Sequence, residues 1–160
     1  RVRRLHQYGW KERYISYEPG LNSRLDELHA AILRAKLVTL RADNARRAEL
    51  AAIYTRALSG TVYTPPAVPA GVTHVYHQYV IRAPRRDALL AALSARGIPA
   101  AIHYPQPVHL QPAYAGRIAL GVGGLPATER ACGEILSLPM HPHLGEDAVQ
   151  YVLAALRELA

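Results

Sequence analysis

The longest periodic stretch of the sequence lies between Ser23 and Tyr54, and it limits the possible folds more than any other feature. Apolar residues recur there at the three- and four-residue spacing of one helix face. Ser23 and Asp26 have the spacing of a capping box, and Ser59-Gly60 is a typical stop signal. The pattern predicts one long helix, or two helices joined near Asp43-Asn44.

The remaining sequence alternates β-prone and helical segments separated by loops. The 12 prolines and 11 glycines exclude a simple helical bundle. The predicted strands are 74–82, 98–104 and 136–138, and the predicted helices are 84–96, 127–135 and 146–159. Residues 105–126 are a predicted loop. This alternation predicts an α/β chain in which helices pack against a small sheet.

Composition narrows the class of protein. Half of the 160 residues are hydrophobic and 19% are charged, which is typical of a globular chain. No run of 18 apolar residues occurs, so we expect no membrane span. Cys132 is the only cysteine, which excludes an internal disulfide and fits a reducing cytoplasm. The opening Arg1-Val2-Arg3-Arg4, without Met, is typical of a start inside a longer protein.

The net charge of +7 leaves three kinds of partner open: nucleic acid, a membrane surface or a phosphorylated small molecule. Apart from Arg1–Arg4 the basic residues are scattered and do not alternate with aromatic residues. The sequence therefore favours neither nucleic acid nor a membrane. His141-Pro142-His143 has no third ligand at suitable spacing, so we expect no metal site.

Two segments carry candidate binding residues. His103-Tyr104-Pro105 follows a predicted strand, where a proline-stiffened loop can present polar side chains to a cleft; the alternative is an ordinary surface loop. Asn22, Ser23 and Arg24 precede a long helix, whose N-terminus favours anions. The alternative there is plain helix capping, with Arg24 facing solvent.

These residues belong to longer motifs that resemble one known family. Gly20-Leu21-Asn22-Ser23-Arg24-Leu25-Asp26-Glu27-Leu28-His29, followed by His103-Tyr104-Pro105 and Leu136-Ser137-Leu138-Pro139, is similar to the DegT/DnrJ/EryC1/StrS family. Its members are sugar-nucleotide aminotransferases that use pyridoxal phosphate. The resemblance covers nearly the whole chain in one order. It implies the small C-terminal domain of the type I pyridoxal-phosphate-dependent aminotransferase fold, with a long helix, a short, mainly antiparallel sheet and packed helices.

The resemblance also implies where the domain boundary lies and which residues contact the cofactor and the substrate. Residues 1–21 would end the large cofactor-binding domain and residues 22–160 would form the long helix and the small domain. The lysine that forms the Schiff base is expected upstream, so no catalytic residue is assigned here. By position, Asn22 matches a residue that contacts the cofactor phosphate across a dimer. Arg24, His103 and Tyr104 match residues of the sugar-nucleotide pocket, and Tyr14 and His109 are further candidates beside these motifs.

The reaction implied by the resemblance is amino transfer from glutamate to a keto sugar of a nucleoside-diphosphate sugar, with carbon three favoured over carbon four. An obligate homodimer with shared sites is expected, and the 160 residues alone would be inactive and poorly soluble. Two other classes remain open at this point. One is a regulatory protein, with DNA binding as one version, and the other is a non-catalytic interaction subunit.

Overall fold

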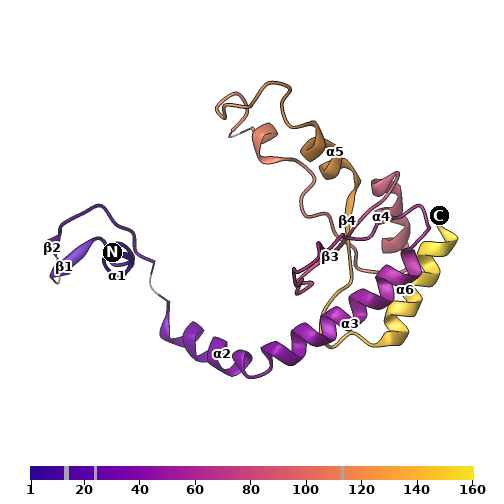
Figure 1. The fold of residues 1–160 in the computed structure, drawn as a ribbon, viewed down its shortest axis with the longest axis horizontal. Coiled ribbons are helices and arrows are strands. Elements are labelled where there is room, and N and C mark those ends of the chain that lie inside the picture. Colours follow the sequence, from indigo (N-terminus) through magenta and orange to yellow (C-terminus); the bar gives the residue numbers. More distant parts are fainter. Residues whose placement is uncertain (13–14, 24, 113) are drawn as a thin grey trace. The chain divides into compact units, whose positions relative to one another are not determined.

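The computed structural model describes residues 1–12, 15–23, 25–112 and 114–160, which form two compact units. Unit 1 is Arg1–Arg41 and unit 2 is Ala42–Ala160. The helices and strands are, in chain order, α1 (Val2–Leu5), β1 (Trp10–Glu12), β2 (Ile15–Ser16), α2 (Glu27–Leu37), α3 (Leu40–Leu58), β3 (Tyr79–Arg82), α4 (Arg86–Ala95), the 3-10 helix η1 (Val108–Leu110), α5 (Pro126–Glu134), β4 (Ile135–Leu138) and α6 (Glu146–Glu158) (Figure 1).

Unit 1 is built on a small antiparallel pair, β1 and β2, that follows α1. Two glycines let its backbone segments approach closely. A Cβ on Gly9, whose φ is +74°, would fall on the carbonyl of Glu18, and a Cβ on Gly20 would fall on the backbone of Tyr8 and Gly9. Only glycine fits at such contacts. The Gly20 position is therefore fixed by sterics within this unit.

The helix that opens the long periodic stretch begins later than the capping box predicts. Asp26 is the N-cap of α2, and its Oδ1 accepts from the backbone N–H of Leu28 at 2.9 Å and of His29 at 3.4 Å. Ser23 instead donates its backbone N–H to His6 O at 3.0 Å. The predicted cap at Ser23 is therefore wrong, because the earlier residues pair with the segment after α1.

The long stretch forms two helices rather than one. The predicted junction at Asp43-Asn44 is wrong, since α2 ends at Leu37 and α3 begins at Leu40. The break falls at β-branched residues, where Thr39 donates both its N–H and its hydroxyl to Lys36 O at 3.3 Å. These bonds replace the regular helical pattern at this turn.

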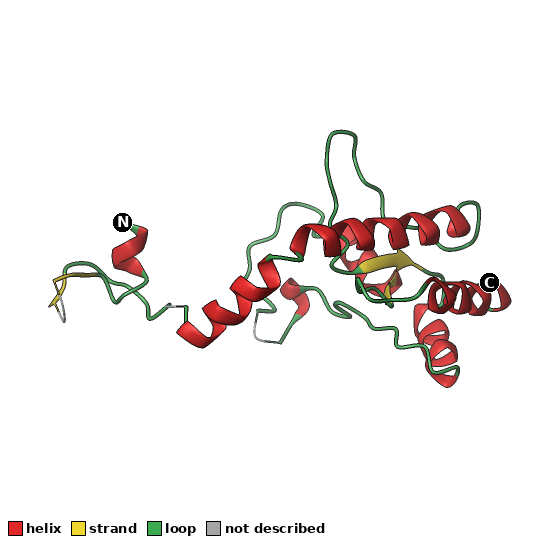
Figure 2. Cartoon of the chain, turned by 90° about the horizontal axis from the view of Figure 1, so that it is seen from below, coloured by secondary structure: helices red, strands yellow, loops and turns green. Residues whose placement is uncertain are grey.

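Unit 2 has a single hydrophobic core around the antiparallel pair β3–β4. Tyr79 lies opposite Leu138 and Arg82 lies opposite Ile135 in this pair. Figures 1 and 2 show α3, α4 and α6 gathered around the two strands. The core is filled by fully buried side chains of these elements: Leu50, Tyr54, Leu58, Tyr79, Ile81, Leu93, Leu136, Val149, Leu153 and Leu156.

Two predicted strands are shorter than the sequence indicates. Only 79–82 of the predicted strand 74–82 pairs, because Tyr76 has a φ of +47° and donates its N–H to His74 Nδ1. Of the predicted strand 98–104, only Ala101 pairs, through an isolated bridge to Ser137. By contrast, Gly97, with a φ of +70°, directly follows the C-cap of α4 as predicted.

Buried tyrosines join α3 to the strand pair. The rings of Tyr54 and Tyr79 stack with centroids 5.0 Å apart, and Tyr54 Oη donates to Pro139 O at 3.2 Å. The hydroxyls of Tyr79 and Thr55 lie 2.8 Å apart. Burial raises the pKa of Tyr54 well above its ordinary value and that of Tyr79 to about 12, because charge is costly in the core.

A buried arginine joins α4 to the junction between α5 and β4. Arg86, at the start of α4, donates Nη1 to the carbonyls of Cys132 and Ile135 at 3.0 and 3.1 Å. Its Nε lies 2.7 Å from Asp87 Oδ1. The guanidinium thus satisfies carbonyls at the α5–β4 junction, which the helix itself leaves open.

Candidate active site

His103 is held in place by β4, a strand that lies more than 30 positions later in the sequence. Ser137 of β4 pairs with Ala101 through two backbone hydrogen bonds of 2.8 and 3.1 Å. The Ser137 hydroxyl lies 2.9 Å from His103 Nδ1, and Ser137 is a buried residue. One serine therefore fixes both the backbone before the histidine and the imidazole ring. Nε2 remains available to a ligand or to solvent.

Tyr104 stands beside His103 and is open to solvent. The two rings meet edge to face with centroids 5.7 Å apart, and 71% of the Tyr104 surface is exposed. An exposed phenol beside an oriented imidazole gives two polar groups at one point of the surface. Such a pair can donate hydrogen bonds to the hydroxyl or phosphate oxygens of a ligand.

His109 has a different environment from His103. It is buried, and its Nε2 lies 3.0 Å from Glu129 Oε1 of α5. Gln106 Nε2 donates to Leu110 O at 2.6 Å across the same turn. Because its Nε2 is already paired, His109 ties the loop after His103 to α5, which makes direct ligand contact by this residue less favourable.

Asn22 lies in unit 1, in a backbone segment that is held on both sides. It forms an isolated antiparallel bridge with Gln7, and the N–H of Tyr8 donates to Leu21 O at 3.0 Å. The residue is exposed and precedes the first turn of α2 by a few positions. The bridge to Gln7 and the close backbone contact at Gly20 therefore fix the backbone position of Asn22.

The predicted site residues fall into three groups. His103 and Tyr104 are brought together in unit 2, whereas Asn22 belongs to unit 1. Arg24 and Tyr14 lie outside the described residues. Sequence reasoning did not single out Ser137, although a serine between two leucines of a short apolar strand is a signal for a buried hydroxyl with a partner.

The described residues also bear on metal binding and on membrane insertion. Within these residues, no group of three metal-ligating side chains is found. In the same part of the chain, no helix is both long enough and apolar enough to cross a membrane.

The fold and these segments are those of an aminotransferase family. The model of the DegT/DnrJ/EryC1/StrS aminotransferase family matches residues 1–157, and the chain belongs to this family. This confirms the predicted family and the fold class, the small domain of the type I pyridoxal-phosphate-dependent aminotransferases.

Several curated relatives are similar over nearly the whole chain. The "dTDP-3-amino-3,4,6-trideoxy-alpha-D-glucose transaminase" of Streptomyces venezuelae is 45% identical over 161 residues, which is 100% of this chain and 42% of that protein. The "Erythromycin biosynthesis sensory transduction protein EryC1" of Saccharopolyspora erythraea is 43% identical over 98% of this chain and 43% of its own. The chain thus spans less than half the length of these relatives.

Solved structures agree with the same assignment. The crystal structure of S. venezuelae DesV matches with a TM-score of 0.92 and 43% identity, covering 99% of this chain and 43% of that one. A DegT DnrJ EryC1 StrS aminotransferase from Brucella abortus matches with a TM-score of 0.92 and 38% identity, covering 99% and 42%.

Proposed function

We propose that the protein transfers the amino group of glutamate to a keto sugar carried on a nucleoside diphosphate, with pyridoxal phosphate as its cofactor. The observation that carries this proposal is the 45% identity, over the full chain, to a relative named as a dTDP-amino-sugar transaminase. We also propose a location in the cytoplasm, because the single cysteine fits a reducing compartment.

The segment around Asn22 fits the phosphate group of the proposed cofactor. A phosphate accepts hydrogen bonds from amides near a helix start, and Asn22 is an exposed residue that precedes α2. Neither lysine matches the family's anchor: Lys11 Nζ lies 5.4 Å from the Tyr17 ring centroid, and Lys36 is in the last turn of α2. When bound, pyridoxal phosphate supplies the electron sink for amino transfer. We propose that Asn22 holds its phosphate and that the lysine comes from outside this chain.

The substrate contacts are assigned to Arg24, His103 and Tyr104. The fixed imidazole of His103 and the exposed phenol of Tyr104 supply orienting hydrogen bonds to the sugar or its phosphates. Arg24 supplies the charge that a diphosphate favours. We assign these groups to binding and orientation of the substrate, and we assign no proton transfer to them.

Transfer at carbon three of the sugar is supported by the names of the relatives. Besides the Streptomyces venezuelae transaminase, a 37% identical protein of Pseudomonas aeruginosa is named "UDP-2-acetamido-2-deoxy-3-oxo-D-glucuronate aminotransferase". Both names place the reacting group at position three. We therefore propose a 3-keto sugar as the substrate in preference to a 4-keto sugar.

A homodimer with shared sites is proposed from the character of α2. None of its residues is buried, and its apolar side chains are exposed: Leu28, Ile32, Leu33 and Leu37. An apolar hollow of about 540 Å³ lies along this helix. Apolar surface of this kind is normally covered by protein.

We also propose a division into two domains. Residues 1–21 end the large domain and residues 22–160 form the small domain. The 160 residues by themselves would be inactive.

The direct test is amino transfer by the full-length protein. With pyridoxal phosphate, glutamate and a dTDP-3-keto or dTDP-4-keto hexose, the aminated product is identified by mass spectrometry and NMR. We expect amination of the 3-keto sugar, with kcat/KM about tenfold lower in Tyr104→Phe, which loses one hydroxyl contact. Tyr151→Phe, on the exposed surface of α6, is the matched control. No amino transfer to either sugar would refute the proposal.

A regulatory role is the second candidate, since two relatives bear regulatory names. Besides EryC1, a 45% identical protein of Geobacillus stearothermophilus is named "Pleiotropic regulatory protein". DNA binding would give salt-dependent retention of the full-length protein on double-stranded DNA, with a steep loss of affinity between low and physiological salt. We expect no such retention, because the positive charge is scattered.

A further inference from the structure

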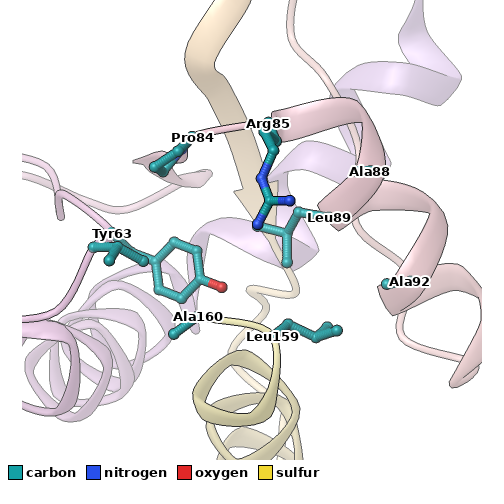
Figure 3. A pocket seen from close by; sticks show the side chains of 9 residues that line it. Tyr63, Pro84, Arg85, Ala88, Leu89, Ala92, Leu159 and Ala160 are labelled. Atoms are coloured by element: carbon teal, nitrogen blue, oxygen red, sulfur yellow. The ribbon is translucent and has the colours of Figure 1, made fainter.

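Unit 2 contains a cavity that lies outside the proposed active-site residues. Its volume is about 350 Å³, within the size range of small-molecule sites. The walls come from the segment after α3, the start of α4 and the end of the chain after α6 (Figure 3). They are mainly apolar, with Pro84, Leu89, Ala92 and Leu159 among them.

A buried tyrosine hydroxyl faces this cavity without a partner. Tyr63 is only 4% exposed, and its Oη has no hydrogen-bond partner among the described residues. Figure 3 shows the ring at one side of the cavity with the hydroxyl pointing into it. Leaving a buried hydroxyl unsatisfied costs about 1–3 kcal/mol. The cost is recovered if a ligand accepts this hydrogen bond.

A positively charged side chain reaches the same place. Arg85 directly precedes α4 and has a φ of +49°, a conformation that non-glycine residues rarely adopt. Its guanidinium extends into the cavity in Figure 3. Among the described residues no ion pair includes Arg85, whereas Arg82 and Arg86 each pair with a carboxylate. Burial raises the pKa of the Tyr63 hydroxyl, and the charge of Arg85 opposes that rise, as expected for two groups close together.

We propose that this cavity binds a small carboxylate with an apolar body. The Arg85 guanidinium holds the carboxylate, the Tyr63 hydroxyl donates a hydrogen bond to it, and the aliphatic walls cover the rest of the molecule. One cation matches a monoanion, and apolar walls disfavour a fully hydrated anion such as phosphate. The site does not depend on the proposed amino transfer, because none of its residues is assigned to that reaction.

The test is isothermal titration of the full-length protein with three probes: 4-methylpentanoate, acetate and inorganic phosphate. We expect 4-methylpentanoate to bind at least tenfold more tightly than either bare anion. Arg85→Gln should weaken its binding at least tenfold and Tyr63→Phe at least threefold. Arg96→Gln removes the same charge at the other end of α4, where Arg96 pairs with Glu158, and should leave binding unchanged.

A second measurement separates ligand binding from folding. Without ligand, Tyr63→Phe should raise Tm, because it removes an unpartnered buried hydroxyl. With saturating 4-methylpentanoate, the wild type should gain more in Tm than this variant. The proposal is overturned if 4-methylpentanoate does not bind, if phosphate binds as tightly, if Arg85→Gln binds equally well, or if Tyr63→Phe lowers Tm and leaves affinity unchanged.

Discussion

The two units of this chain are stabilised in different ways. Unit 2 buries leucines, valines and tyrosines from three helices and two strands in one core. In unit 1, Gly9 is the only described residue that is buried, and α2 exposes its apolar side chains. Unit 1 is held instead by backbone pairing and by ion pairs such as Arg4–Glu18 at 3.1 Å. Unit 2 therefore has a core of its own, whereas unit 1 has apolar surface suited to an interface.

The largest expected effect is the loss of a core leucine in unit 2. Leu50→Ala should lower the free energy of unfolding by about 2–5 kcal/mol, because Leu50 is fully buried and a cavity would remain. Leu33→Ala is the matched change on α2 and should cost under about 0.5 kcal/mol in the isolated chain. Urea unfolding followed by circular dichroism measures both. Equal costs would mean that α2 is covered already within this chain.

Gly20→Ala tests whether close backbone contact determines unit 1. Its Cβ would collide with backbone atoms of Tyr8 and Gly9, so we expect a loss of about 3 kcal/mol or more in the stability of this unit. Cofactor affinity of the full-length protein, followed by the pyridoxal absorbance, should fall with it. Gly121→Ala, where nothing lies within 4 Å of an added Cβ, is the control and should change neither quantity. Unchanged affinity in Gly20→Ala would contradict the role given to this glycine.

Alkaline pH should destabilise unit 2 through its buried tyrosines. The pKa of Tyr79 is raised to about 12 from an unfolded value of 10, so Tyr79 loses its proton at a lower pH in the unfolded chain than in the folded one. The contribution of this hydroxyl to the free energy of unfolding is fully present below pH 10 and falls by roughly 2 kcal/mol as the pH rises to 12. Unfolding free energies measured across this range should therefore decline.

Tyrosine-to-phenylalanine substitutions test which hydroxyl causes the decline in stability at alkaline pH. Tyr79→Phe should reduce the slope of stability against pH, because one titrating hydroxyl is gone. Tyr8→Phe, at an exposed tyrosine of unit 1, is the matched change for comparison. An identical slope in wild type and Tyr79→Phe would show that this hydroxyl does not carry the pH dependence.

The smallest expected effect concerns the serine that holds His103. Ser137→Ala should cost about 1 kcal/mol of stability through the lost hydrogen bond. If His103 orients the sugar nucleotide, KM should rise several-fold with little change in kcat, because a binding contact is weakened. Ser94→Ala, an exposed serine of α4, is the control. A KM equal to that of the wild type would remove Ser137 from the site.

The sequence alone predicted elements whose signals are local. The helix 146–159 and the strand 136–138 were expected within a residue or two of α6 and β4, because apolar spacing and turn residues define them. The end of α4 at Gly97 was also predicted from a local signal, a glycine directly after a helical segment. The motifs around Asn22 and His103 also indicate the family, since their order along the chain is specific.

The tertiary structure decided what depends on residues distant in sequence. Asp26 replaces Ser23 as the cap because Ser23 pairs with His6, and the segment 98–104 is not a strand because it has a partner only at Ser137. The hydrogen bond between Ser137 and His103 joins residues 34 positions apart. No periodicity can reveal such contacts, because hydrogen-bond partners and close approach are set by how the chain packs. Local spacing determined the elements of this protein, and packing determined which side chains those elements bring together.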